Sequence, residues 1–475
     1  MDEKDRIAES ARTEPSVAQQ APAQQSTDGE PPYPSPAYAW YVVGLLMVVY
    51  VFSFMDRQIL GLLVGPIKRD LDISDTQLSY LMGLSFALFY TFFGIPLGRL
   101  ADSVSRRGLI TAGLFFWSLM TAGCGVARYY WHFVLLRMGV GVGEASLSPA
   151  AYSLISDSFP RNKLGTAISV YAMGIYLGTG LSYLIGGLVV RWVGAEPFLT
   201  VPLIGEMRSW QIVFLALGIP GMLLTVVMIT VKEPVRRGMR RASATGSATV
   251  QEPLSDVIRY LGRNWKTLTC HNVGFALLAF SSYGTTSWIP AFFHRTYGWR
   301  AADTGVIYGA IVALFGTSGI VFGGWLADRM AHGGSPAAKM KVGVFAAIVW
   351  ATTGFVYPLV PSGTLSMVLL APTVFFVAMP FGIAPAAIQE MMPNPMRGQA
   401  SAIYLFVVNL IGLGLGPSAV AWVTDYGFGD EAMLRYSLVI VGTFAHVAAT
   451  VLLWIGVGQF HKSIHLRDEW TADNG

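Results

Sequence analysis

The sequence reads GRLAD at residues 98–102 and GWLAD at residues 324–328, so two closely similar stretches lie 226 positions apart (324 − 98). Each stretch ends a long apolar run. A second set of residues recurs 233 positions later (390 − 157): Asp157, Pro160 and Gly165 return as Glu390, Pro393 and Gly398. Two matches at nearly the same offset indicate a duplicated chain. Duplicated helical halves are typical of secondary transporters, which bind the substrate between the halves near the middle of the membrane.

The composition of the chain is that of a membrane protein. Of the 475 residues, 53% are hydrophobic and only 13% are charged, and the mean hydropathy is +0.51. In soluble domains about a quarter of the residues are charged. The 52 glycines allow helices to pack closely in lipid, and the 13 Trp and 20 Tyr residues suit the two membrane interfaces. This composition excludes an ordinary cytosolic enzyme.

Twelve apolar runs are long enough to cross a hydrocarbon core of about 30 Å, which takes about 20 helical residues. The runs do not alternate between polar and apolar residues, which excludes a barrel of spanning strands. We therefore predict an all-α membrane protein with twelve transmembrane helices, arranged as two six-helix halves around a central cavity. The expected spans are residues 38–65, 76–101, 107–127, 130–156, 164–190, 210–232, 264–293, 302–327, 338–360, 364–390, 398–424 and 434–459.

Polar segments divide the chain into five parts. Residues 1–37 are rich in Ala, Gln and Pro without apolar periodicity, which predicts a disordered tail. A basic segment with Pro234 separates the sixth and seventh spans. The predicted parts are a cytoplasmic tail at 1–37, a six-helix bundle at 38–232, a cytoplasmic central loop at 233–263, a second six-helix bundle at 264–460 and a cytoplasmic tail at 461–475.

The basic residues predict the orientation. Of the 32 Lys and Arg residues, 22 lie in the two tails and in the loops on the same side of the membrane, eight lie in the opposite loops and two lie inside spans. Because basic loops stay cytoplasmic, both termini are expected inside the cell. The net charge of +4 is thus a signal for topology and does not indicate a nucleic-acid partner. The absence of any Asn-x-Ser/Thr sequon favours a bacterial inner membrane.

Charged residues at the cytoplasmic ends of the spans form a candidate gate. In the first half, the short loop after the second span faces the inner end of the fourth span, and the second half partly repeats this arrangement. The acids in these loops add nothing to the positive-inside rule, so we expect them to latch the halves together when the cavity opens outward. The alternative is a purely topological role. The gate residues are Asp102, Arg106, Arg107, Asp157, Asp328, Arg329 and Glu390.

Four charged side chains lie well inside the predicted spans, namely Asp56, Arg57, Arg137 and Glu144. A charge at mid-membrane costs at least about 2.5–3.5 kcal/mol, so it is expected to be paired or to face water, and to be functional. Arg137 and Glu144 share one face of the fourth helix, with Glu144 about 10 Å deeper. An acid of the first helix, Asp56, can then meet Arg137, with Glu144 as a second acid below.

This cluster is a candidate proton site. Burial favours the neutral form of a carboxyl group and a nearby Arg favours the charged form, so a moving Arg would change the affinity for a proton. We expect Asp56 and Glu144 to carry protons, and Arg57 and Arg137 to control them or to bind an anionic group of the substrate. The alternative is a permanent salt-bridge cluster that fixes the first helix to the fourth.

These motifs carry a family resemblance. The loop Gly98-x-x-x-Asp102 with Arg106-Arg107 resembles the signature loop of the major facilitator superfamily, and Arg137-x-x-x-Gly141-x-Gly143 is similar to its fourth-helix motif. Ser103 and Ser105 depart from the pattern, where a basic residue and a Gly are usual. Within the superfamily, the sequence around Asp56-Arg57, and the stretch from Gly143-Glu144-Ala145 to Asp157-Ser158-Phe159-Pro160, resemble the Spinster family. The resemblance implies the major facilitator fold and a lipid-like cargo.

The second half has no Asp, Glu, Lys or Arg inside its spans. Its polar candidates for substrate contact include Tyr283 and Asn409. A cavity with charge on one wall and an apolar surface on the other suits an amphiphile better than a sugar, which would need many hydrogen-bond donors and acceptors.

These observations predict a proton-coupled secondary transporter that works by alternating access. The Spinster resemblance implies a lysophospholipid or sphingoid phosphate as cargo. One alternative is an organic-anion/proton symporter of the same superfamily, and another is a membrane receptor or sensor that binds without transporting. The sequence lacks a phosphate-binding P-loop and a hydrolase or metalloprotease motif, so we expect no enzymatic activity, no cofactor and no metal. We expect a monomer whose partners are the bilayer, protons and the substrate.

Overall fold

The computed structural model describes residues 33–193, 198–201, 205–236, 254–335, 337–393 and 396–474. From Pro34 onward the chain forms one compact unit. Most of the expected tail, residues 1–32, and most of the expected central loop, residues 237–253, lie outside the described residues. The first described helix, α2, begins at Pro36.

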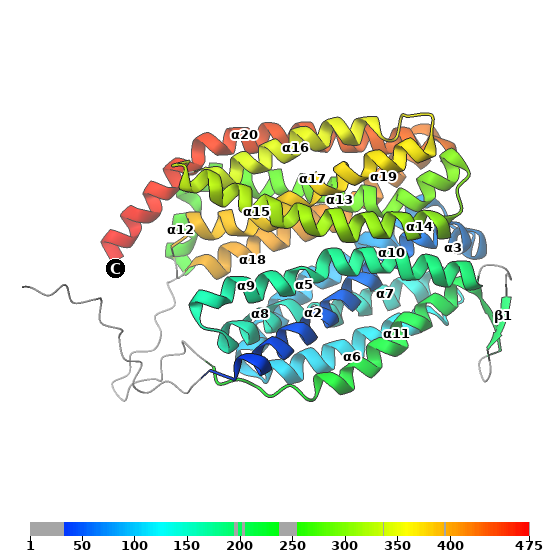
Figure 1. Ribbon diagram of the computed structural model, residues 1–475, viewed down its shortest axis with the longest axis horizontal. Coiled ribbons are helices and arrows are strands. Elements are labelled where there is room, and N and C mark those ends of the chain that lie inside the picture. The colour runs from blue at the N-terminus through cyan, green and yellow to red at the C-terminus, as the bar shows by residue number, and fades with distance from the viewer. Residues whose placement is uncertain are drawn as a thin grey trace, which may run out of the picture. The chain divides into compact units, whose positions relative to one another are not determined.

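The first half crosses the membrane six times. Its helices run side by side in Figure 1. The crossings are α2 (Pro36–Gln58) with the turn η1 (Ile59–Leu62); α4 (Asp75–Ser79), η2 (Tyr80–Leu84) and α5 (Ser85–Ser103); α6 (Arg106–Cys124); α7 (Tyr130–Glu144) and α8 (Leu147–Ser158); α9 (Arg161–Ala172) and α10 (Gly174–Val193); and α11 (Ser209–Met228). Between crossings lie the short helix α3 (Val64–Leu71) and the antiparallel strands β1 (Phe198–Val201) and β2 (Gly205–Arg208), with Phe198 opposite Arg208.

The second half repeats the six crossings. They are α13 (Trp265–Tyr297); α14 (Ala301–Ile311), η3 (Val312–Gly316) and α15 (Thr317–His332); α16 (Ala338–Val356); α17 (Gly363–Met391); α18 (Arg397–Val407), η5 (Val408–Leu415), α19 (Gly416–Trp422) and η6 (Val423–Phe428); and α20 (Leu434–Asn474). The remaining elements are α12 (Leu254–Arg263), which occupies the end of the expected central loop, and the turn η7 (Glu431–Met433). The expected C-terminal tail continues α20 as helix as far as Asn474.

The twelve crossings agree with the predicted fold class. Nine helical segments within the described ranges are long and apolar enough to span a membrane by length and composition alone. The other three crossings are α6, the broken pair α7 and α8, and α13. The pair α7 and α8 is interrupted at Ala145 and Ser146, and α13 carries polar residues such as His271 and Asn272. The prediction of an all-α fold with twelve transmembrane helices is confirmed.

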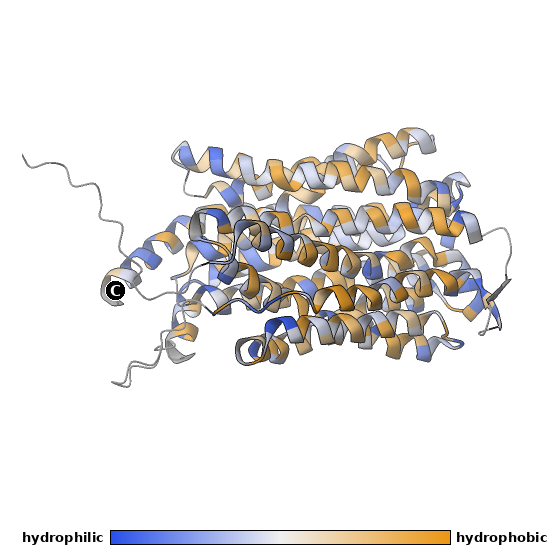
Figure 2. Ribbon diagram, turned by 60° about the horizontal axis from the view of Figure 1, so that its bottom comes forward, coloured by the Kyte–Doolittle hydropathy of each residue, from blue (hydrophilic) through white to orange (hydrophobic). Residues whose placement is uncertain are grey.

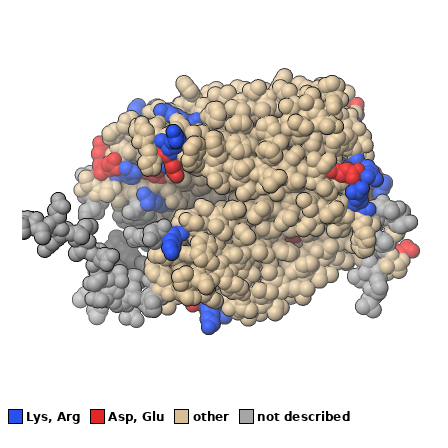
Figure 3. Space-filling model, in the orientation of Figure 1, with Lys and Arg blue, Asp and Glu red and all other residues tan. Residues whose placement is uncertain are grey.

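The distribution of charged and hydrophobic residues on the surface fits a protein that spans a membrane. In Figure 3 the visible charged residues gather at the two ends of the bundle and leave an uncharged band between them, and Figure 2 shows hydrophobic residues along the same stretch of the helices. We call the end that holds the loop between α5 and α6 the basic end, and the end that holds α3 the distal end. Helix α2 begins, and α20 ends, at the basic end (Figure 1).

The two halves meet along pairs of helices from opposite halves. Helix α10 packs against α14, and α5 packs against η5. The α10–α14 contact depends on glycine: a Cβ atom on Gly309 would lie 2.5 Å from the carbonyl oxygen of Gly180, and a Cβ atom on Gly180 would lie 2.7 Å from that of Gly309. This close backbone contact places the cavity-lining faces of the two halves opposite each other.

Candidate functional site

The four intramembrane charges lie together in the first half. Asp56 and Arg57 come from the last turn of α2, and Arg137 and Glu144 come from α7. All four are buried, with at most 7% of their surface exposed. The structure thus places all the charged residues predicted inside the spans in one cluster.

Arg57 and Glu144 form the ion pair of this cluster. The Nε of Arg57 donates to Oε2 of Glu144 at 2.7 Å, and the hydroxyl of Ser53 donates to the same oxygen at 2.5 Å. The guanidinium carbon of Arg57 lies 4.7–4.9 Å from the ring centroids of three aromatic residues. These are Phe54, Phe86 and Tyr90. Arg57 is therefore held both by a carboxylate and by three aromatic faces, which attract a cation through their ring quadrupoles.

Asp56 and Arg137 are not paired through their side chains, which corrects the pairing expected from the sequence. Nη1 of Arg137 donates to the main-chain oxygen of Asp56 at 3.1 Å, and its Nε donates to the main-chain oxygen of Leu81 at 3.3 Å. The carboxylate of Asp56 accepts from the hydroxyl of Thr121 at 3.0 Å. Consecutive residues of a helix point about 100° apart, so only one of Asp56 and Arg57 can face the polar side of α7 directly, and here it is Arg57.

Several polar atoms of the cluster have no hydrogen-bond partner among the described residues. They are Oδ1 of Asp56, Oε1 of Glu144 and Nη2 of Arg137. Buried polar atoms are nearly always hydrogen-bonded, and exceptions call for an explanation. Each of the two carboxylates therefore has an oxygen free to bind a proton, and Arg137 has an N–H group free to donate to a further acceptor.

A cavity lies between the two halves beside this cluster. Its walls come from α2 and α10 in the first half and from α13, α14, α16 and α17 in the second, and none of its described lining residues is charged. The aromatic lining residues are Phe54, Tyr176, Tyr283, Tyr308, Trp350 and Phe381. Phe54 also contacts Arg57, so this ring lines the cavity and packs against the charged cluster.

The two polar residues predicted for the second half differ in position. Tyr283 lines the cavity, with its ring centroid 6.4 Å from that of Phe381. Asn409 lies in η5, which packs against α5 and η2 of the first half, and it is not among the described lining residues.

An ion-pair network joins the halves at the distal end. Arg295 of α13 binds both carboxylate oxygens of Asp75, at 2.5 and 2.8 Å, and Lys68 binds the same carboxylate at 2.5 Å. Glu431 completes the network through Lys68 at 2.5 Å and Arg295 at 2.8 Å. We call these four residues the distal lock. Lys68 and Asp75 belong to the first half, and Arg295 and Glu431 to the second, so the lock holds the halves together at this end.

A second contact supports the distal lock. The main-chain N–H of Thr76, in the first turn of α4, donates to Oδ2 of Asp425 in the other half at 2.7 Å. A carboxylate at a helix N-terminus is stabilised by the helix dipole and by the free N–H groups there. None of these residues was expected in a gate, because partners such as Asp75 and Arg295 are 220 positions apart and no local pattern connects them.

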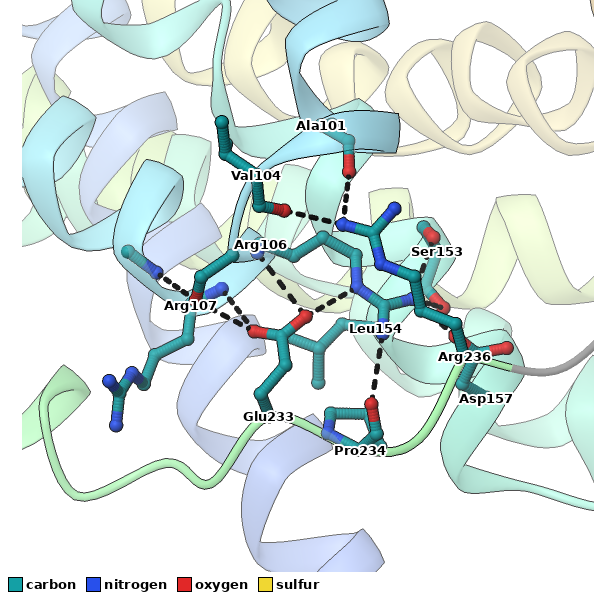
Figure 4. Close-up of polar contacts among 12 residues, drawn as sticks. Ala101, Val104, Arg106, Arg107, Ser153, Leu154, Asp157, Glu233, Pro234 and Arg236 are labelled. Carbon is teal, nitrogen blue, oxygen red and sulfur yellow. Dashed lines mark hydrogen bonds and ion pairs between the residues drawn. The ribbon is translucent and has the colours of Figure 1, made fainter. Parts of the chain in front are cut away.

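At the basic end, Arg106 organises the predicted gate of the first half (Figure 4). Its guanidinium binds the Asp157 carboxylate, and Nη1 also donates to the hydroxyl of Ser153 at 2.8 Å. Nε of Arg106 donates to Glu233 at 2.7 Å, and the main-chain N–H of Arg107 donates to the other oxygen of Glu233 at 2.9 Å. Glu233, the first residue of the expected central loop, thus caps the start of α6 and is a member of this cluster that sequence reasoning missed.

In the second half, Glu390 pairs with Lys339 at 2.6 Å. Lys339 is 233 positions after Arg106 (339 − 106), which is the offset that relates Glu390 to Asp157. The repeat signal could therefore have identified Lys339 as the counterpart of Arg106. Arg329, which was expected in the gate of the second half, instead lies over the ring of Trp325, with its guanidinium carbon 5.5 Å from the ring centroid.

Among the gate side chains that the structure describes, no contact given above joins the two halves. Asp328 is exposed, and the side chain of Asp102 lies outside the described part of the chain. The ion pairs at the basic end join residues of the same half. A contact that latches the two halves together at this end stays a prediction.

The contacts of Glu233 predict that the thermal stability of the protein depends on pH. Partial burial raises the pKa of this carboxyl, but hydrogen bonds from the Arg107 N–H, the Arg106 guanidinium and Ser105 outweigh burial and hold the pKa below its ordinary value. A depressed pKa stabilises the fold above the unfolded pKa of about 4.3, and this contribution is lost as the pH falls through the folded pKa. Glu233→Gln should therefore lower the melting temperature at pH 7. The difference from the wild type should shrink below about pH 4; a difference that persists unchanged there would contradict this role.

Two six-helix halves, a cavity between them and contacts that close one end define the class of protein as a multi-pass membrane transporter. The family model of the Major Facilitator Superfamily matches residues 46–417, and the chain belongs to this superfamily. Within it, the chain is similar to proteins of the Spinster family.

Three relatives show the range of similar proteins. The chain is 27% identical over 441 residues to an MFS-type efflux pump of Mycolicibacterium smegmatis, covering 90% of this chain and 95% of the pump. It is 24% identical to a probable L-galactonate transporter of Escherichia coli, covering 86% of this chain and 88% of the relative. It is 25% identical to human protein spinster homolog 1, covering 78% of this chain and 73% of the relative.

Solved structures support the fold. A bacterial homolog to the human lysosomal transporter Spinster, in an inward-facing and unoccupied conformation, superposes with a TM-score of 0.73 at 24% identity, covering 92% of this chain and 99% of the homolog. A D-xylose-proton symporter superposes with a TM-score of 0.65 at 17% identity, covering 87% and 97%. The predicted membership of the superfamily and the resemblance to the Spinster family are confirmed.

Proposed function

We propose that this transporter couples the movement of protons to the movement of an amphiphilic, lipid-like substrate such as a lysophospholipid or a sphingoid phosphate. The observation that carries the proposal is the position of a buried acid and arginine cluster next to an aromatic, uncharged cavity. The cluster supplies proton-binding carboxylates and a cation for an anionic headgroup, and the cavity supplies a surface for an apolar tail.

The two acids have different roles in this proposal. Glu144 accepts hydrogen bonds from Arg57 and Ser53, which favour its charged form. Asp56 has one neutral donor, Thr121, and Arg137 is occupied by main-chain oxygens. A buried carboxyl without a cationic partner favours its neutral form. In this proposal both acids carry protons: Asp56 binds one beside Thr121, and Glu144 takes one when Arg57 turns away toward an anionic substrate.

The cavity favours an amphiphile over a small hydrophilic solute. Its aromatic lining offers an apolar surface, while hydroxyl groups such as those of Thr179 and Thr286 provide a few hydrogen bonds. Arg57, whose guanidinium packs against the Phe54 ring that lines the cavity, is the cation that would bind a phosphate. Arg137 and Tyr283 complete the proposed contacts, and Asn409 would contribute only after η5 moves relative to α5.

Alternating access would use the two ends of the bundle in turn. We place the basic end in the cytoplasm of a bacterium and the distal end outside, since basic loops stay cytoplasmic. In the present state the distal lock closes the outside. Opening it would let Arg106, Asp157 and their counterparts in the second half approach each other and latch the cytoplasmic side. A single chain provides both halves of the cavity, so it acts as a monomer.

A second candidate is an organic-anion/proton symporter. The similarity to a probable L-galactonate transporter supports it, because a sugar acid would need a cation such as Arg57 or Arg137. This candidate uses the same proton site and differs in the cargo.

The test is uptake of a labelled lysophospholipid into proteoliposomes, with and without an imposed pH gradient. We expect uptake that depends on the gradient, and loss of that dependence in Glu144→Gln and Asp56→Asn. Asp303→Asn is the matched control, because Asp303 is an acid in an exposed pair with Arg300 outside the cluster.

Each other outcome has a defined meaning. If uptake by the wild type does not depend on the pH gradient, proton coupling is refuted. Binding of the lipid without uptake would identify a receptor or sensor. Neither binding nor uptake, together with gradient-driven uptake of a sugar acid such as L-galactonate, would establish the anion symporter.

A further inference from the structure

Helix α12 has two faces of different character. Val257 and Tyr260 are buried against the second half, and the hydroxyl of Tyr260 donates to the main-chain oxygen of Met391 at 2.9 Å. Met391 is the last residue of α17 and follows Glu390, the partner of Lys339. The inner face of α12 is therefore fixed to the basic end of α17.

The opposite face of α12 combines apolar and basic side chains. Ile258 of α12 is 60% exposed, and Trp265, the first residue of α13, is 59% exposed. Arg259, Arg263 and Lys266 are also exposed, and Nζ of Lys266 lies 5.8 Å from the ring of Trp265. No Asp or Glu occurs between residues 257 and 266. An apolar stripe beside a basic stripe is the pattern of helices that lie in a membrane interface.

The position of α12 fits this pattern. Only Asn264 separates α12 from α13, which crosses the membrane, so α12 lies directly beside the basic end of a membrane-spanning helix. In Figure 1, α12 lies across the direction of the membrane-spanning helices, as a helix parallel to the membrane plane would. At a membrane interface, the ring of a Trp residue lies among the lipid headgroups and the ammonium of a Lys residue lies in the water layer.

We propose that α12 and the first turn of α13 form a docking surface for anionic phospholipids of the leaflet at the basic end. Ile258 and Trp265 insert among the upper acyl chains, and Arg263 and Lys266 bind phosphate groups. The charge of this face is complementary to an anionic headgroup and not to a zwitterionic one. Because Tyr260 joins the same helix to Met391, bound lipid fixes the end of α17 next to Glu390.

The test measures the environment of residue 258 in the full-length protein. A nitroxide is attached to Ile258→Cys, while the native Cys124 and Cys270 are buried. The protein is reconstituted in vesicles of phosphatidylcholine alone or with added phosphatidylglycerol. We expect the label to become less accessible to a water-soluble nickel chelate and more accessible to oxygen when phosphatidylglycerol is present.

Two double variants make the result specific. Arg263→Gln with Lys266→Gln should abolish the effect of phosphatidylglycerol. Lys163→Gln with Lys462→Gln removes the same charge from exposed positions elsewhere and should leave the effect unchanged. High nickel accessibility in both lipids would show that the helix faces water or another protein. Equal protection in both lipids would show insertion without recognition of anionic lipid. Either result overturns the proposal, and neither bears on the transport test above.

Discussion

Asp75→Asn is expected to open the distal end of the transporter. The Asp75 side chain is fully buried and binds Arg295 twice and Lys68 once. Removing one partner of a buried ion pair costs about 3–5 kcal/mol, and each 1.4 kcal/mol changes a population about tenfold. The loss falls on the closed state, because water can solvate Lys68 and Arg295 once the end opens. The population of the open state should therefore rise at least ~100-fold.

Distances between spin labels measure this opening. Arg69 and Arg300 are suitable positions, since both side chains are 71% exposed and they lie in different halves near the lock. Labels at Arg69→Cys and Arg300→Cys should show a longer mean distance in Asp75→Asn than in the wild type.

Glu431→Gln is the matched control for this prediction. Glu431 contacts the same two cations as Asp75, but its side chain is 56% exposed. An exposed ion pair contributes about 0–1 kcal/mol, so this variant should change the distance only slightly. Equal opening in the two variants, or no opening in Asp75→Asn, would show that Asp75 does not control the distal end.

The sequence was sufficient to predict the fold, because the fold depends on features that are local along the chain. Twelve apolar runs define twelve crossings, and the repeated stretches at residues 98–102 and 324–328 relate the two halves. The contact between Arg106 and Asp157 was also predictable from the sequence, because a short loop holds Arg106 close to the end of α8.

Contacts between distant segments were not predictable in the same way. Glu233 reaches α6 from a position 126 residues away, and the distal lock joins residues from four separate segments. Such contacts depend on the rotation and tilt of each helix, and a composition or a spacing does not contain that information. The charged cluster illustrates this limit: its four members were identified from their depth, but a rotation of about 100° between neighbours decided that Arg57, and not Asp56, forms the pair with α7.

The pair of Arg57 and Glu144 gives the second large expected effect, a strong asymmetry between its two single variants. Arg57→Met leaves Glu144 buried with only Ser53 as a donor. Loss of one partner of a buried ion pair destabilises by about 3–5 kcal/mol, and proton binding by Glu144 offsets only part of this cost. Glu144→Gln leaves Arg57 among the rings of Phe54, Phe86 and Tyr90, each of which contributes about 0.5–2 kcal/mol to a nearby cation. Arg57→Met should therefore lower the melting temperature in detergent more than Glu144→Gln does.

The double variant Arg57→Met/Glu144→Gln separates the stability of the cluster from its function. It removes both charges, so its stability should recover to within about 1 kcal/mol of the wild type, in line with apolar replacements of buried ion pairs. If the pair were only a permanent link between the first and fourth helices, this restored protein would also transport normally. If the pair takes part in proton coupling, the restored protein will fold and reconstitute but show no gradient-driven uptake. A double variant whose losses simply add would instead show that Arg57 and Glu144 act independently, because additive losses are the sign of residues that do not interact.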